Sequence, residues 1–195
     1  MGRDATVNRV TKETNISIKL NIDGKGNSSV NTGIGFFDHM LEGFAKHGLF
    51  DLTVEVKGDT QVDAHHTVED TGIVLGQAFR EALGDKAGIS RFGYFILPMD
   101  DALVLASLDI SGRTYFAYEA QLQTQLLGTM ETETIKEFFA GFASGVQMNL
   151  HIRQMAGENT HHIAEAMFKA VAKAMDMATR IDERIDGVLS TKGTL

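Results

Sequence analysis

A short motif occurs twice in this sequence, and the repeat limits the folds that the chain can adopt. The segment Asp63–Asp70 (DAHHTVED) returns in the second half of the chain as Asn159–Ala166 (NTHHIAEA). The same elements precede each copy in the same order, so we expect two similar structural halves. The matching elements are Phe36-Phe37 and Phe138-Phe139, Phe44-Ala45 and Phe142-Ala143, the alternating runs Leu52–Val56 and Leu150–Ile152, and the glycine turns Gly58-Asp59 and Gly157–Asn159.

The hydrophobic pattern of each half predicts strands followed by helices. Apolar and polar residues alternate from Ile16 to Ile22, as in a strand with one buried face, and Ala5–Thr11 can pair with it. The second half opens with Tyr94–Leu97, Leu103–Ile110 and Arg113–Tyr118, all rich in strand formers. Helical spacing begins at each phenylalanine pair and again at each HHxxE. Because antiparallel strands bury one face, we predict an α+β fold with the helices between two sheets.

This organisation predicts one compact duplicated domain. We expect residues 1–88 to form the first repeat half, 89–187 the second and 188–195 a C-terminal tail. With 195 residues, 43% of them hydrophobic, the chain can bury a real core. No apolar run is long enough to span a membrane, and Met1–Thr14 is too polar for a signal peptide, so the expected location is the cytoplasm.

Composition excludes several classes of partner and cofactor. The formal net charge of -8 disfavours nucleic acid, whose binding needs a basic face, but a few local cations could still hold a small phosphorylated ligand. The chain has no cysteine, and therefore no thiolate nucleophile and no thiolate metal site. Any metal must be bound by imidazole and carboxylate groups.

The first HHxxE motif has the spacing of a metal site. A lone copy is weak evidence, because it also describes a polar helix start, but duplication favours a metal. On a helix His65 and Glu69 are four residues apart and share a face, so both can reach one ion. His66 is turned by about 100° and is expected to serve a second ion.

The second copy repeats this assignment, with His161 and Glu165 on one metal and His162 on the other. If the halves are related by a pseudo-two-fold axis, each His/Glu pair is completed by the neighbouring histidine of the other copy. This arrangement predicts two metals in similar shells.

Four residues outside the motifs are weaker candidates. His39 follows the first phenylalanine pair, and the alignment of the two halves places Glu137 opposite it, where it is a ligand or an exposed helix acid. His47 precedes a glycine and could face a substrate. His151 lies in an alternating strand and is a further ligand or a structural histidine.

Five segments make the chain similar to the imidazoleglycerol-phosphate dehydratase family over nearly its whole length. The resemblance implies a duplicated unit of a four-stranded sheet and two helices, of the ribosomal protein S5 domain 2-like type, with the helices sandwiched between the sheets. It also implies a homo-oligomer of twenty-four chains built from trimers, with active sites at subunit interfaces. The segments are Gly33–Met40, Asp63–Asp70, Ser107–Arg113, Leu150–Arg153 and Ala156–His162.

The resemblance further implies two Mn²⁺ ions in each active site and a set of residues around them. An eighth metal ligand falls at position 137, where some relatives have histidine and this chain has Glu137. Glu13, His47 and Glu165 are the implied catalytic residues. The implied metal ligands are His39, His65, His66, Glu69, Glu137, His161, His162 and Glu165. The implied substrate-binding residues are Glu13 and His47, which would line the substrate site, and Arg91, Arg113, Lys169, Ser190 and Lys192, which would bind phosphate, the last two in the tail.

The reaction implied by the resemblance is the conversion of D-erythro-imidazole glycerol phosphate to imidazole acetol phosphate and water in histidine biosynthesis, through a dimetal-stabilised imidazolate. Glu13 is the leading candidate for proton transfer, with His47 or a metal-bound water as competitors. A dinuclear metallohydrolase and a metal-storage shell are the alternatives. The hydrolase would cleave phosphoesters, and the storage protein would load many more ions than two per chain.

Overall fold

A computed structural model describes residues 2–195, so Met1 of the predicted 1–88 half lies outside the described residues. The first half of the chain forms three strands, a helix, a strand and a second helix. Alternation of buried apolar and exposed polar side chains explains β2, and helical spacing of apolar residues explains α1 and α2. The elements are β1 (Asp4–Val10), β2 (Thr14–Asn21), β3 (Ser28–Asn31), α1 (Gly35–Gly48), β4 (Asp51–Gly58) and α2 (His65–Leu83).

The second half repeats this order, with one small hairpin inserted before its first helix. The inserted strands are β8 (Leu126–Leu127) and β9 (Met130–Glu131). The repeated elements are β5 (Phe92–Met99), β6 (Ala102–Asp109), β7 (Tyr115–Glu119), α3 (Thr134–Val146), β10 (Asn149–Ala156) and α4 (Thr160–Thr179).

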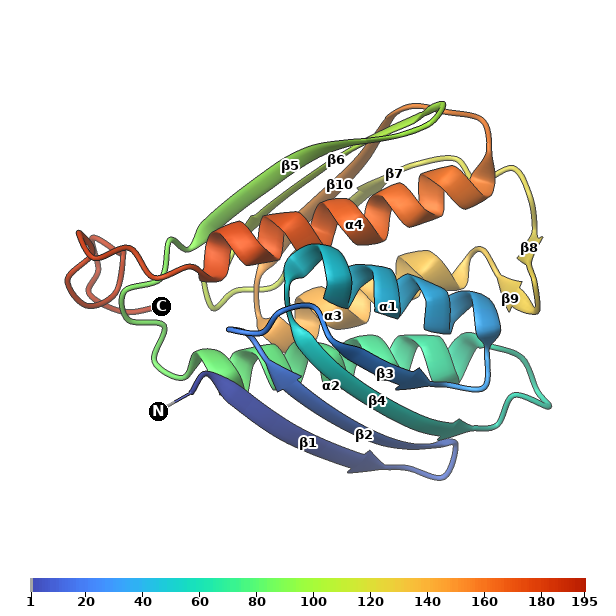
Figure 1. The fold of residues 1–195 in the computed structure, drawn as a ribbon, viewed down its shortest axis with the longest axis horizontal. Helices are drawn as coiled ribbons and strands as arrows, with labels where there is room; N and C mark the ends of the chain where they lie inside the picture. Colours follow the sequence, from blue (N-terminus) through green and yellow to red (C-terminus); the bar gives the residue numbers. More distant parts are fainter. Residues whose placement is uncertain (1) are drawn as a thin grey trace.

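The two four-stranded sheets have the same topology. Their strand orders are β1-β2-β4-β3 and β5-β6-β10-β7, and each has three antiparallel strands with a parallel fourth strand at one edge. Figure 1 shows one sheet below and one above, with the four helices between them. The predicted α+β sandwich with two four-stranded sheets is therefore confirmed.

The core lies among the helices, where the repeated phenylalanines meet. Phe37 and Phe138 contact each other edge to face, with ring centroids 5.4 Å apart, and Phe44 and Phe142 do the same at 5.8 Å. All four side chains are fully buried. Such aromatic pairs add directional contacts to hydrophobic burial, so they fix how the two halves pack against each other.

All four helices begin at the same end of the molecule (Figure 1). The C-terminal tail follows α4 and lies at the opposite end, together with the N-terminus. Among the described residues, no helix is both long and apolar enough to cross a bilayer.

Helices α2 and α3 approach each other closely because glycines lie at their crossing. A Cβ built on Gly145 would lie 2.4 Å from the Ile73 carbonyl oxygen, and one on Gly76 would lie 2.5 Å from that of Phe142. These contacts involve helical backbone, which cannot move aside as a side chain can. This crossing sets the position of α2, and therefore of the first HHxxE motif at its start.

Replacing Gly145 with alanine is expected to destabilise the protein by about 1–3 kcal/mol, the usual cost of inserting atoms into a packed core. Gly43 in α1 is the matched control, because a Cβ there meets nothing within 4 Å. Gly43→Ala should stabilise the fold by roughly 0.5–1 kcal/mol through helix propensity. Urea unfolding of both variants measures the difference, and equal shifts of the midpoints would contradict this account of the crossing.

Candidate metal centre and anion pocket

The start of α4 gathers three groups that can ligate a metal. The Asn159 side chain accepts hydrogen bonds from the backbone amides of His161 and His162 and so caps the helix. One turn further on, Glu165 Oε2 lies 3.3 Å from His161 Nε2. His39 of α1 joins them, and one ligand atom from each of His39, His161 and Glu165 lies within 4.8 Å of the others.

Glu165 is held as a carboxylate by its neighbours. Burial alone raises the pKa of this side chain, but the hydrogen bond from Lys169 and the charges of Lys169, His39 and His161 lower it more, so the pKa falls below its ordinary value. Lys169 Nζ lies 2.6 Å from Glu165 Oε1. The second oxygen of Glu165 therefore remains directed to His161 as an ionised ligand.

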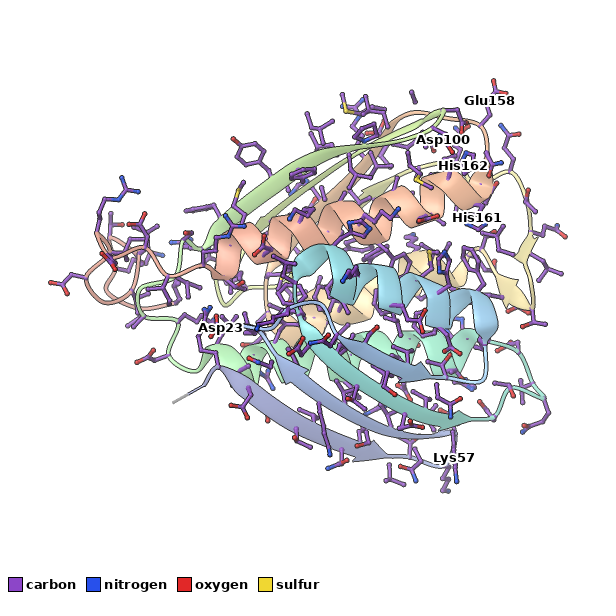
Figure 2. All side chains as sticks on the ribbon, in the orientation of Figure 1. Asp23, Lys57, Asp100, Glu158, His161 and His162 are labelled. Carbon is purple, nitrogen blue, oxygen red and sulfur yellow. The ribbon has the colours of Figure 1, made fainter. Side chains whose placement is uncertain are left out.

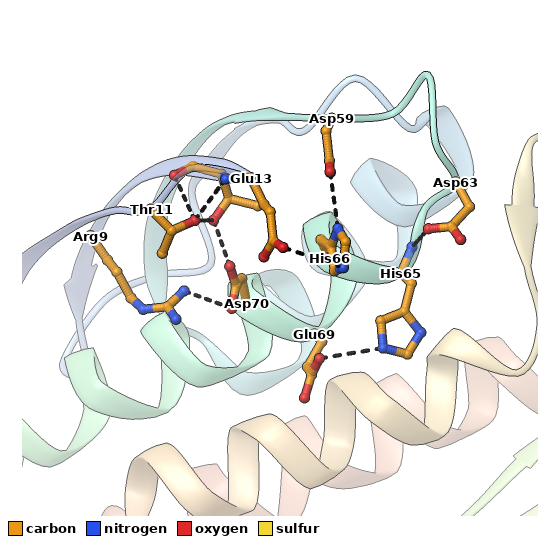
Figure 3. Close-up of polar contacts among 10 residues, drawn as sticks. Arg9, Thr11, Glu13, Asp59, Asp63, His65, His66, Glu69 and Asp70 are labelled. Carbon is orange, nitrogen blue, oxygen red and sulfur yellow. Dashed lines mark hydrogen bonds and ion pairs between the residues drawn. The ribbon is translucent and has the colours of Figure 1, made fainter.

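The start of α2 repeats the pair but not the third group. His65 Nε2 lies 3.4 Å from Glu69 Oε2, the same i,i+4 contact as in α4 (Figure 3). Glu137 lies in the first turn of α3, the counterpart of α1. Among residues 2–195 the one cluster of three close potential ligands is that of His39, so the metal role of Glu137 stays a prediction.

His66 and His162, the second histidines of the motifs, turn away from these pairs toward other acids. His66 Nδ1 lies 3.0 Å from Asp59 Oδ2, and this hydrogen bond raises the pKa of His66. His162 Nδ1 lies 2.7 Å from Asp101 Oδ1. Figure 2 shows His161 and His162 at the start of α4. Sequence reasoning missed both aspartates, because each lies in a turn and its partner is set by tertiary structure.

Within one chain, therefore, neither HHxxE motif supplies the missing ligand of the other motif's potential metal site. The predicted exchange, in which the neighbouring histidine of one copy completes the His/Glu pair of the other, does not occur among the described residues of this single chain. Contacts between chains could provide it, and the exchange stays a prediction at that level.

Glu13 lies in the turn between β1 and β2, beside the first motif. Its Oε1 is 3.9 Å from His66 Nε2, and half of its side chain is exposed (Figure 3). The turn is anchored to α2, because Thr14 Oγ1 donates to Asp70 Oδ2 and Arg9 forms an ion pair with the other oxygen of Asp70. Sequence reasoning did not single out this network, which fixes Glu13 relative to the helix that carries His66.

His47 lies in the last turn of α1, on the side facing α4. Partial burial lowers its pKa, and the positive charges of Lys169 and Lys173 lower it further. The lowered pKa favours the neutral imidazole, which can accept a proton. His151 lies elsewhere, on β10, with its ring 5.5 Å from that of Tyr115.

A separate, cationic pocket lies beside the C-terminal tail. Its volume is about 610 Å³, and four of the five predicted phosphate-binding residues line it, namely Arg91, Arg113, Ser190 and Lys192. Arg91 is fixed by Asp109, with Nε 2.6 Å from Oδ1, and by a hydrogen bond to the Leu189 carbonyl. The fifth residue, Lys169, does not line this pocket and pairs with Glu165 instead.

The helix starts that carry the HHxxE motifs lie at one end of the molecule, and the C-terminal tail that lines the cationic pocket lies at the other (Figure 1). The 20 residues of α4 separate the two ends, a length of about 30 Å. A small substrate cannot span this distance.

The donor set of His39, His161 and Glu165 fits a divalent first-row cation. Two imidazole nitrogens and one ionised carboxylate are ligands that Mn²⁺, Fe²⁺ and Zn²⁺ all accept in proteins, and the chain has no thiolate to favour a softer metal. Fold and site together define a duplicated α+β protein with imidazole and carboxylate clusters at its helix starts.

Comparison with known proteins identifies the family. Residues 32–175 match the family model "Imidazoleglycerol-phosphate dehydratase". Proteins of that name from Lachnoclostridium phytofermentans and Acetivibrio thermocellus are 61% and 57% identical to this chain over 195 residues, the full length of both partners. The chain belongs to the imidazoleglycerol-phosphate dehydratase family. Membership confirms the predicted resemblance and the predicted enzyme class, a hydro-lyase.

Two solved structures of the family share the fold. The dehydratase from Staphylococcus aureus superposes with a TM-score of 0.83 at 36% identity, covering 92% of this chain and 99% of that one. The enzyme from Pyrococcus furiosus, in complex with (S)-C348, gives 0.84 at 40% identity, covering 97% and 100%. The duplicated sandwich is thus the family fold over nearly the whole chain.

Proposed function

We propose that this chain dehydrates D-erythro-imidazole glycerol phosphate to imidazole acetol phosphate in histidine biosynthesis, using two Mn²⁺ ions. The observation that carries the metal requirement is the convergence of His39, His161 and Glu165, with the matching His65–Glu69 pair at the other motif. His66, His162 and Glu137 are the remaining proposed ligands. When bound, the cations supply Lewis acidity that stabilises negative charge on the imidazole ring of the substrate.

We propose that Glu13 transfers the proton lost from the substrate side chain. It is an exposed carboxylate beside His66 and is fixed to α2 through Thr14 and Asp70. A positioned carboxylate can take the proton from carbon and return one to the leaving hydroxyl group. His47, held neutral by its surroundings, is the competing candidate.

We propose that the cationic pocket binds the phosphate group. Arg91 and Arg113 offer planar guanidinium donors, and Ser190 and Lys192 add a hydroxyl and an ammonium from the tail. Because the tail that lines this pocket lies at the far end of the molecule from the helix starts that carry the HHxxE motifs, we infer that the complete active site forms between chains. The proposed assembly of twenty-four chains built from trimers would allow this, and light scattering measures its mass.

The proposed function is tested by incubating Mn²⁺-loaded protein with imidazole glycerol phosphate and measuring formation of the ketone. Folded, metal-loaded protein that forms none would overturn the proposal. Release of inorganic phosphate from the substrate would instead identify a hydrolase. Loading of many more than two ions per chain, measured by elemental analysis, would identify a metal-storage shell.

Arg113→Ala is expected to raise the KM for substrate roughly 10- to 150-fold with a smaller change in kcat, because a hydrogen bond to a charged group contributes about 1.5–3 kcal/mol. Arg184→Ala is the matched control, since Arg184 lines the same pocket but is 88% exposed and paired with Asp182. Steady-state kinetics separates the two variants. An equal rise in KM for both would show that the pocket acts only through its general positive potential.

A further inference from the structure

The second histidine of each HHxxE motif makes the same contact with an acid. His66 Nδ1 lies 3.0 Å from Asp59 Oδ2, and His162 Nδ1 lies 2.7 Å from Asp101 Oδ1. An ionised carboxylate can only accept hydrogen bonds, so the Nδ1 atom of each neutral ring must carry the proton. Each Nε2 atom then keeps its lone pair.

The two acids come from different places in the repeat. Asp59 follows β4 and precedes α2, whereas Asp101 lies in the turn between β5 and β6. The residue that matches Asp59 in the second half is Glu158, and its exposed side chain makes no such contact with His162 among the described residues. The contact to Nδ1 is therefore not a simple copy of the duplicated unit. Two different routes lead to the same geometry, which indicates that the contact itself is needed.

Both acids are held in place for this contact. Asp101 Oδ2 accepts hydrogen bonds from the backbone amides of Glu158 and Asn159, at 2.7 and 3.0 Å, directly before α4. These bonds, together with the one to His162, hold the pKa of Asp101 well below its usual range. Asp59 Oδ1 is buried without a hydrogen-bond partner among the described residues. A buried unpaired oxygen is costly, so its retention points to a role for the other oxygen.

The other nitrogen of each ring, Nε2, is directed toward further acidic groups. His66 Nε2 lies 3.9 Å from Glu13 Oε1, and His162 Nε2 lies 3.4 Å from Asp100 Oδ2. His65 and His161 likewise present Nε2 to the carboxylates one turn away. All four motif histidines thus direct the same ring nitrogen toward carboxylate oxygens. Histidines that bind metals commonly donate the other ring N–H to a carboxylate, which fixes the tautomer and the ring orientation.

We propose that Asp59 and Asp101 are positioning residues that fix His66 and His162 in the Nδ1–H tautomer and aim Nε2 of each ring at a divalent cation. The cation in this inference rests on the proposed function, whereas the tautomer can be observed without it. The competing explanation is that each ring is doubly protonated and forms ordinary ion pairs with the acids on both sides.

The tautomer is measured by solid-state ¹⁵N NMR of the metal-free full-length protein labelled in its histidines, at mildly alkaline pH. We expect neutral Nδ1–H signals for His66 and His162 in the wild type. Asp59→Asn should remove the first and Asp101→Asn the second, because an amide can donate to Nδ1 and favour the other tautomer without changing the geometry. Wild-type rings that are imidazolium or protonated at Nε2 would overturn the proposal.

Metal affinity gives the second readout, by EPR titration with Mn²⁺ alone. Each of the two variants should bind Mn²⁺ about 10- to 100-fold more weakly, the usual effect of losing such a supporting contact. Asp63→Asn and Glu158→Gln are the matched controls. Each control removes one negative charge near the same helix starts. An asparagine at position 63 can still accept the hydrogen bond that the His65 backbone amide donates to Asp63. Both controls should retain wild-type affinity and wild-type spectra.

The outcomes separate this inference from the proposed function. Wild-type protein that shows the Nδ1–H tautomers but binds no Mn²⁺ would contradict the proposed function and would leave the positioning of the rings supported. Wild-type protein that binds Mn²⁺, with Asp59→Asn and Asp101→Asn variants that match it in affinity and spectra, would overturn the inference alone. Weakening by Asp63→Asn and Glu158→Gln to the same extent would also overturn it, because bulk charge would then explain the effect.

Discussion

His161→Ala is expected to lose bound Mn²⁺ and to reduce turnover by at least about a thousandfold, because the Lewis acidity of a bound cation contributes several kcal/mol and each 1.36 kcal/mol changes a rate tenfold. His161 is one of the three potential ligands in the cluster at the start of α4. Its Nε2 lies 3.3 Å from Glu165, and its ring centroid lies 6.1 Å from that of His39. Alanine removes this nitrogen and leaves two of the three potential ligands.

The effect of His161→Ala is measured as metal content by elemental analysis and as kcat with imidazole glycerol phosphate. His151→Ala is the matched control, since this histidine lies on β10 against Tyr115 and outside the cluster. It should keep wild-type metal content and turnover. Retention of one equivalent of Mn²⁺ and full activity by the His161→Ala variant would show that the cluster at the start of α4 is not a metal site.

Much of the fold could be predicted from the sequence because the two halves confirm each other. Alternation identified β2, β4 and β10, enrichment in strand formers identified β6, and the phenylalanine pairs identified the starts of α1 and α3. The hydrophobic pattern did not indicate the short hairpin β8–β9, nor the edge strand β3, Ser28–Asn31. Its sequence SSVN has one apolar residue, and the strand forms because it pairs in parallel with β4. Such an edge strand depends on its neighbour and has little signal of its own.

The local part of the site was also predictable. The i,i+4 spacing placed His65 with Glu69 and His161 with Glu165, and the structure gives nearly equal distances of 3.4 and 3.3 Å for these pairs. Helical geometry alone fixes such contacts. The distance between the histidines and the cationic pocket could not be predicted, because it depends on where the tail folds after α4.

The two halves also differ in ways that the shared motif hides. Asp70 anchors the turn that carries Glu13 to α2, but the matching position in the second motif is Ala166. His39 lies in the cluster at the second motif, whereas its counterpart in the repeat, Glu137, belongs to no such cluster among residues 2–195. The duplication therefore supplies two related half-sites with unequal surroundings. In the first half-site the β1–β2 turn is tied to α2 through Asp70, whereas in the second the β5–β6 turn is tied through Asp101 to the backbone amides that precede α4.

Glu13→Gln is expected to lower kcat roughly 10²- to 10⁴-fold with little change in KM, because glutamine keeps the shape of the side chain but cannot accept a proton from carbon. The anchoring of the β1–β2 turn supports this expectation. Thr11 Oγ1 accepts hydrogen bonds from the amides of Glu13 and Thr14, and Thr14 Oγ1 donates to Asp70. The substitution leaves these contacts unchanged, so loss of activity would report on the carboxylate itself.

Two further variants decide between the candidates for proton transfer. Glu42→Gln removes an exposed acid from α1 and should have wild-type kinetics. His47→Gln tests the competitor, and a large fall in kcat there, with the Glu13→Gln enzyme unchanged, would transfer the role to His47.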